Sequence, residues 1–235
     1  MKLFIFALLP SLCLGLSSLI DAANMALKNS PSSNRFITNR MCPYAQKVWC
    51  ALEVSRTPYE MEEIGLYGAG GKPSWFLKLN PRGTVPVLVT HGGAAVYPDS
   101  DVVLDQYEIG NLRGNAPIYP PPDRKDVRES IKLWRCLINN MLDDGRESVL
   151  SSESVPSKAL QKHLEEMDKA VVGPYIASQR VTTADCHAFP FVWRLKQEYS
   201  TAFATDYPAL NEWVETCEQQ PEFSRTVQSS WWWWW

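Results

Sequence analysis

Long runs of one charge sign are missing from this 235-residue chain, although it has 23 Lys and Arg and 26 Asp and Glu. The formal net charge at pH 7 is −3, and the basic residues are scattered. Proteins that bind nucleic acid normally cluster Lys and Arg where they meet phosphates. We therefore expect no nucleic-acid partner.

Metal-ligand and disulfide patterns are missing as well. Cys13 lies in an apolar N-terminal run, and the other five cysteines are odd in number, widely spaced and without a C-x-x-C pair. The three histidines show no spacing from cysteine that is typical of a zinc site. We expect neither a disulfide framework nor a metal ion.

Residues 1–23 differ from the rest of the chain. Lys2 is followed by apolar residues up to Ile20 and then by Ala22 and Ala23. This order is typical of a secretory signal peptide. An uncleaved membrane anchor stays open as an alternative, although a proline and a glycine interrupt the run. If the signal is cleaved, we expect the secretory route or an organelle reached through it; otherwise we expect a cytoplasmic protein.

The stretch around Cys42 carries the strongest chemical signal. A short apolar run, residues 36–38, predicts a strand, and apolar residues after Pro43 recur at helical spacing. Pro43 suits a first helical turn, so Cys42 is expected at the N-cap, beside the positive end of the helix dipole. With Arg40 and Lys47 nearby, we predict a reactive thiol whose pKa lies below about 8.5. The alternative is a buried cysteine that happens to precede a helix.

The predicted elements fall into two blocks, which we expect to be domains. Residues 34–111 follow the order β-α-β, α, β-β-α, and residues 112–124, rich in proline, predict a linker. Residues 125–228 are helical in pattern; they include a capping box at Thr182–Asp185 and a kink at Pro190. The tail, residues 229–235, is of low complexity, and its tryptophans are either a terminal artefact or a membrane or partner contact.

Two segments resemble glutathione enzymes. Residues 42–45, Cys-Pro-Tyr-Ala, are similar to the active-site turn of thioredoxin-fold glutathione enzymes with one catalytic cysteine; dithiol relatives have a second Cys where this chain has Ala45. Cys50 lies about 12 Å further along a helix, beyond disulfide reach, so an external thiol must resolve any intermediate. Residues 80–88 resemble the N-P-x-G-x-V-P-V-L segment of glutathione transferases. That resemblance implies a cis Val85–Pro86 bond and a backbone edge that pairs with glutathione.

Three further positions are interpreted through the same resemblance. Asp99 and Ser100 resemble the acidic-Ser pair that holds the γ-glutamyl end, and the same atoms also suit a plain helix cap. Lys72 resembles the Lys before Pro that reaches the glycyl carboxylate in omega-class and dehydroascorbate-reductase-type enzymes. Here extra glycines precede it.

Segments 42–48, 72–77, 99–103 and 173–177 together look most like plant-type dehydroascorbate reductases, a resemblance that covers residues 35–220. Those enzymes commonly have Gly-Asp before the catalytic Cys, where this chain has Arg40 and Met41. The resemblance implies glutathione transferase architecture, with an α/β thioredoxin-like N-terminal domain and an all-α C-terminal domain.

The expected function is glutathione-dependent reduction of dehydroascorbate, or thiol transfer, through a mixed disulfide on one catalytic cysteine. The partners are glutathione, as co-substrate, and a small oxidised molecule; monomer and homodimer both stay open. The alternatives are an omega- or lambda-like glutathione transferase and a non-catalytic, chloride-channel-like glutathione-binding protein. The expected site comprises the catalytic Cys42 and the glutathione-binding residues Lys72, Val85, Pro86, Asp99 and Ser100.

Overall fold

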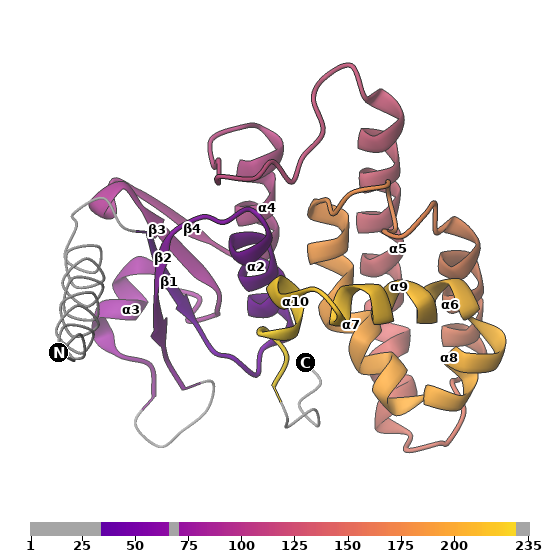
Figure 1. Ribbon diagram of the computed structural model, residues 1–235. Helices are drawn as coiled ribbons and strands as arrows, with labels where there is room; N and C mark the ends of the chain where they lie inside the picture. Colours follow the sequence, from indigo (N-terminus) through magenta and orange to yellow (C-terminus); the bar gives the residue numbers. More distant parts are fainter. Residues whose placement is uncertain (1–33, 66–70, 229–235) are drawn as a thin grey trace, which may run out of the picture.

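The computed structural model describes residues 34–65 and 71–228 (Figure 1). The candidate signal peptide, part of the glycine-rich stretch before Lys72 and the tryptophan tail lie outside the described residues. Within these ranges, the helices are too short or too polar for any of them to cross a membrane.

A four-stranded mixed sheet forms the N-terminal part, in the order β2-β1-β3-β4. Central strand β1 (Asn34–Thr38) runs parallel to β2 (Tyr59–Glu63) and antiparallel to β3 (Val87–Thr90). Strand β3 in turn pairs antiparallel with β4 (Ala95–Pro98), through the 3₁₀ turn η1 (His91–Gly93). This mixed sheet confirms the thioredoxin-like architecture.

Helices cover both faces of the sheet. In Figure 1, α2 (Pro43–Val54) and α4 (Ser100–Glu108) lie on the face toward the helical part, and α3 (Ser74–Leu79) lies on the opposite face. The side chains of β1 alternate accordingly. Phe36 belongs to the large core shared with the helical part, whereas Ile37 packs with Phe76 of α3 in a smaller core.

The C-terminal part is entirely helical within the described residues. Its helices are α5 (Lys125–Leu150), α6 (Lys158–Ala170), α7 (Thr183–Glu198), α8 (Ser200–Asp206), α9 (Pro208–Glu218) and α10 (Pro221–Ser224). The two shortest, α8 and α10, were not predicted, because so few residues leave no apolar periodicity to read.

Helix α7 is the centre of the molecule. It packs against α5 and α9 on one side and against α2 on the other, so it joins the helical part to the sheet domain. Its capping box is confirmed: the Thr182 side chain accepts from the Ala184 N–H, and the Asp185 carboxylate accepts from the Thr182 N–H at 2.7 Å. Pro190 lies inside this helix, which continues to Glu198.

Candidate active site at the N-terminus of helix α2

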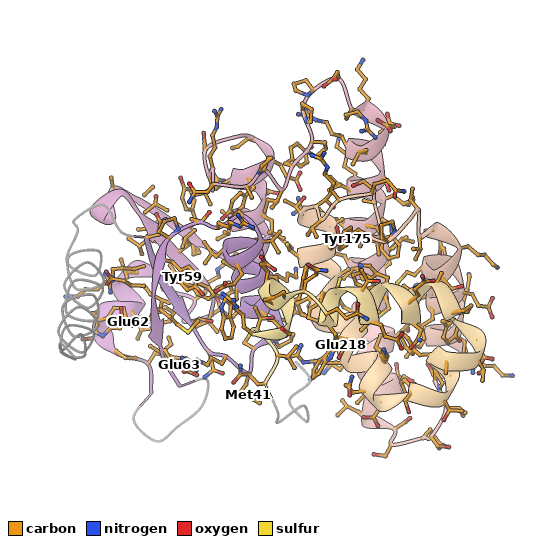
Figure 2. All side chains as sticks on the ribbon, viewed as in Figure 1. Met41, Tyr59, Glu62, Glu63, Tyr175 and Glu218 are labelled. Atoms are coloured by element: carbon orange, nitrogen blue, oxygen red, sulfur yellow. The ribbon has the colours of Figure 1, made fainter. Side chains whose placement is uncertain are left out.

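Cys42 occupies the N-cap of α2, as predicted, with Pro43 in the first helical turn. The turn before it is held by Asn39, whose carbonyl accepts from the Cys42 N–H at 3.0 Å and whose side chain accepts from the Met41 N–H at 3.0 Å. Figure 2 shows Met41 in this turn. Only 9% of Cys42 is exposed, so the thiol sits in a fixed and largely buried position.

Burial raises the pKa of the Cys42 thiol. The N–H groups of Ala45 and Tyr44 and the positive charges of Arg194 and Lys47 act in the opposite direction without overcoming it. The expectation of a lowered pKa is therefore wrong in direction. It counted the helix N-terminus and the nearby cations, but the loss of solvent around the sulfur depends on tertiary packing.

Val85 and Pro86 are joined by a cis peptide bond. Val85 belongs to the same apolar cluster as Cys42 and Ala45. It comes just before the paired part of β3, which begins at Val87. The Pro86 carbonyl accepts from the Asp99 N–H at 3.1 Å, and this bond ties the turn to the start of α4.

Asp99 and Ser100 form the N-terminus of α4. Asp99 is the N-cap, and its side chain accepts from the Asp101 N–H at 2.9 Å. Its backbone has φ of 100°, a conformation that L-residues rarely adopt and that is frequent at functional sites. Ser100 is 3% exposed. The capping role is confirmed, and nothing in the geometry conflicts with a second, ligand-binding role.

Lys72 is placed by different contacts. Its ammonium donates to the Gly65 carbonyl, and its aliphatic stem runs past Gly83, where an added Cβ would meet Lys72 Cγ at 3.6 Å. The structure thus brings Cys42 and Val85 together and links Pro86 to Asp99. Lys72 lies in the loop after β2 and contacts Gly65.

A cluster of ionisable side chains next to this site was missed: Lys47 and His187 are buried, and Asp101 is partly exposed. The Lys47 ammonium is 2.9 Å from Asp101 Oδ1, and His187 Nδ1 is 3.3 Å from the same oxygen. Although burial alone raises the pKa of Asp101, His187 and Lys47 hold it below its usual range. Burial lowers the pKa of His187 to about 4. No sequence signal pointed to His187, because its partners lie on α2 and α4.

A second buried cation, Arg194 of α7, lies close enough to Cys42 to lower the thiol pKa. It is 5% exposed and donates to the Gln46 side chain at 2.7 Å. Neither residue stood out in the sequence. In the described ranges, His, Cys, Asp and Glu form no group of three or more that could hold a metal ion.

Comparison with known proteins identifies the family. Models of the N-terminal and C-terminal domains of glutathione S-transferases match residues 41–108 and 132–221. The probable cytosolic glutathione S-transferase DHAR1 of Oryza sativa subsp. japonica is 32% identical over 160 residues, which cover 66% of this chain and 67% of that protein. The chain belongs to the glutathione transferase family. A second member, glutathione S-transferase DHAR2 of Arabidopsis thaliana, is 31% identical over the same shares.

Solved glutathione transferases share the fold. The enzyme from the Antarctic clam Laternula elliptica superposes with a TM-score of 0.71 at 20% identity, covering 85% of this chain and 94% of that one. Glutathione transferase Omega 1C from Trametes versicolor gives 0.70 at 18% identity, with 84% and 92% covered. These similarities confirm the architecture. Members of this family take glutathione as a substrate, so the residues around Cys42 form the candidate glutathione site of this transferase.

Proposed function

We propose that this glutathione transferase reduces dehydroascorbate, or a small mixed disulfide, with electrons from glutathione. One observation carries the proposal: a single, largely buried cysteine caps α2, and Ala45 stands where a dithiol enzyme has its second cysteine. Chemistry at Cys42 therefore needs a thiol from outside the chain. The names of the relatives in Oryza sativa and Arabidopsis thaliana point to the same activity.

The residues around Cys42 fit an extended glutathione molecule. The backbone of Val85, which lies ahead of the paired part of β3, offers an N–H and a carbonyl to a peptide that adds to the sheet edge. The N-terminus of α4 at Ser100 suits a carboxylate, and the Asp99 carboxylate suits an ammonium group. Lys72 supplies a cation for the second carboxylate of the tripeptide.

The other cysteines support a one-thiol mechanism. Cys50, Cys186 and Cys217 are buried in the core, and burial raises the pKa of each thiol. Cys136 is exposed in the middle of α5, away from any helix N-terminus. Only Cys42, among the described cysteines, combines a helix N-terminus with partial exposure.

The proposed reaction balances in two electrons. The Cys42 thiolate adds to a carbonyl carbon of dehydroascorbate, and the thiolate of a first glutathione then attacks the Cys42 sulfur. The new S–C bond breaks, its electron pair stays on the substrate, which takes up two protons and leaves as ascorbate, and Cys42 is left in a mixed disulfide with that glutathione. With a glutathionylated disulfide, Cys42 attacks the glutathione sulfur directly and the other thiol leaves. The thiolate of a second glutathione attacks the sulfur of the bound glutathione. The S–S bond to Cys42 breaks, oxidised glutathione leaves, and the Cys42 thiolate is restored.

A side-by-side assay tests the proposal, with dehydroascorbate, a glutathionylated disulfide and an aromatic chlorinated electrophile as substrates. We expect turnover with one or both of the first two, its loss in Cys42→Ser, and its retention in the matched control Cys136→Ser. Preferential turnover of the electrophile would instead indicate an omega- or lambda-like conjugating enzyme. Full activity of Cys42→Ser with dehydroascorbate would refute the mechanism, and glutathione binding without any turnover would favour a non-catalytic binding protein.

A further inference from the structure

Arg194 is a buried cation at the junction of the two domains. Its side chain projects from α7 toward the turn that holds Cys42. Nη1 donates to the Pro190 carbonyl at 2.6 Å and to Gln46 Oε1 at 2.7 Å, and Nη2 lies 3.5 Å from the Met41 carbonyl. The remaining nitrogen, Nε, is buried without a hydrogen-bond partner. All three acceptors are neutral oxygen atoms.

This charge has no carboxylate partner among the described residues. The other cations that approach this region are paired: Lys47 with Asp101, and Arg135 with Asp105 and Glu108. A buried, unpaired charge costs several kcal/mol, so it is retained only where something compensates it. Burial lowers the pKa of Arg194 to about 10, and the two groups that act against this effect when they are ionised are Cys42 and Cys50.

Hydrogen-bond directions separate these two thiols. The Thr226 hydroxyl donates to the Phe223 carbonyl at 2.8 Å, so the Cys50 thiol, 3.4 Å from Thr226 Oγ1, must be the donor of its contact. Cys50 is therefore held as a neutral thiol, and burial raises its pKa to about 12. Cys42 lies instead next to Met41, whose carbonyl faces the guanidinium.

Gln46 fixes the guanidinium in this place. Its Nε2 donates to Thr226 Oγ1 at 3.1 Å, which leaves Oε1 as the acceptor for Arg194. The contact spans from α2 to the segment after α10, and the whole chain of polar groups is buried. The orientation of the Gln46 amide is thus determined from both sides.

We propose that Arg194 is the counter-ion of the Cys42 thiolate and that Gln46 positions it. This inference rests on the proposed function, because it takes Cys42 as the reacting thiol. The groups that stabilise the thiolate are the backbone N–H groups of Ala45 and Tyr44, the ammonium of Lys47 and the guanidinium of Arg194, while the Tyr44 phenol is the acidic group that interacts with Cys42. Lys47 is already paired with Asp101, which leaves Arg194 as the uncompensated cation. Arg194 acts on the reaction through the Cys42 sulfur and does not itself touch the substrate, so it is a positioning residue.

The test measures how fast iodoacetamide alkylates Cys42 between pH 5 and 11, with the modified peptide followed by mass spectrometry. We expect Arg194→Met to raise the midpoint of the pH profile by about one pH unit or more. At pH values below the midpoint, this shift corresponds to a thiolate fraction about tenfold smaller. Arg194→Lys should recover part of the shift. The matched control is Arg225→Met. It removes an arginine that pairs with Glu53 of α2, the helix that begins at Cys42, and it should leave the midpoint unchanged.

If Arg194 had only a structural role, its substitution would shift the alkylation midpoint in the opposite direction. If Arg194 only supported packing, its loss would admit water to Cys42 and lower the midpoint toward that of an ordinary cysteine, about 8.5. Such a lowered midpoint, or an unchanged one, would overturn the proposal. If Arg194→Met does not fold, as judged by circular dichroism, Gln46→Glu decides. Its carboxylate would neutralise the guanidinium, so the midpoint should rise.

The alkylation profile is independent of the proposed reaction. It needs neither glutathione nor an oxidised substrate, so it reports on the counter-ion even if the protein proves inactive with dehydroascorbate. Conversely, the protein could turn over dehydroascorbate while Arg194→Met leaves the midpoint of its alkylation profile unchanged. That result would reject Arg194 as the counter-ion and leave the proposed function standing.

Discussion

The Lys47 ammonium lies 2.9 Å from the Asp101 carboxylate, although the lysine side chain is only 1% exposed. This pair joins α2, which begins beside Cys42, to the first turn of α4, which begins beside Asp99. A partly buried ion pair therefore links the helix that carries the thiol to the helix at the amino-acid end of the proposed glutathione site.

Removing the Asp101 carboxylate should destabilise the fold. Asp101→Asn leaves Lys47 buried without its anion, whereas Arg135 keeps Asp105 and Glu108. We expect a loss of about 2–3 kcal/mol in the free energy of unfolding, less than for a fully buried pair because Asp101 is partly exposed. Urea unfolding measures it.

The matched control is Asp126→Asn, which breaks the surface pair with Arg124 and should leave the urea midpoint nearly unchanged. Equal effects of the two substitutions would show that burial of Lys47 does not matter.

His187 should make the protein sensitive to mild acid. Burial lowers its pKa to about 4, whereas an unfolded histidine titrates near 6.5. As pH falls below about 6.5, the unfolded state takes up the proton first. The stabilising contribution is thus complete above pH 6.5 and is lost as pH falls through 4, up to about 3 kcal/mol for this group.

The slope of unfolding free energy against pH checks this expectation. His187→Gln should flatten this slope between pH 6.5 and 4. An unaltered slope in His187→Gln would show that another group causes the acid sensitivity.

Cys42 should react as a thiol with an elevated pKa in the free protein. Because burial raises this pKa, the thiolate fraction at pH 7 is smaller than for an exposed cysteine, and reactivity should increase steadily as pH rises past about 8.5. The difference in ultraviolet thiolate absorbance between wild type and Cys42→Ser gives the titration directly. A midpoint well below 8.5 would contradict the burial argument and restore the sequence-based expectation.

Local patterns predicted the parts of the site that local sequence determines. Pro43 set the N-terminus of α2 and the position of Cys42, and the pairing of Thr182 with Asp185 set the start of α7. Arg194 and Gln46 could not be predicted, since they are 148 residues apart in the chain and meet only when α7 packs on α2.

The direction of the Cys42 pKa shift was predicted wrongly for the same reason. The helix N-terminus is visible in the sequence, but the exclusion of water from the sulfur is a property of the assembled domains. The element that joins those domains, α7, reads in the sequence as ordinary apolar core.

The Asp99 carboxylate can be separated from its role as a helix cap by choosing the substitution. Asp99 has φ of 100°, where glycine is favoured, so Asp99→Gly removes the carboxylate, relieves the backbone strain and leaves a residue that is tolerated at an N-cap, whereas Asp99→Ala keeps the strain and leaves a poor N-cap. If Asp99 holds the ammonium group of glutathione, both variants should weaken glutathione binding by about 1–3 kcal/mol. Only Asp99→Ala should clearly lower Tm. The measurements are the KM for glutathione and the melting curve of each variant, with Ser100→Ala tested in parallel for the adjoining carboxylate. An unchanged KM in Asp99→Gly would mean that Asp99 only caps α4, and the amino-acid end of glutathione would then have to lie elsewhere.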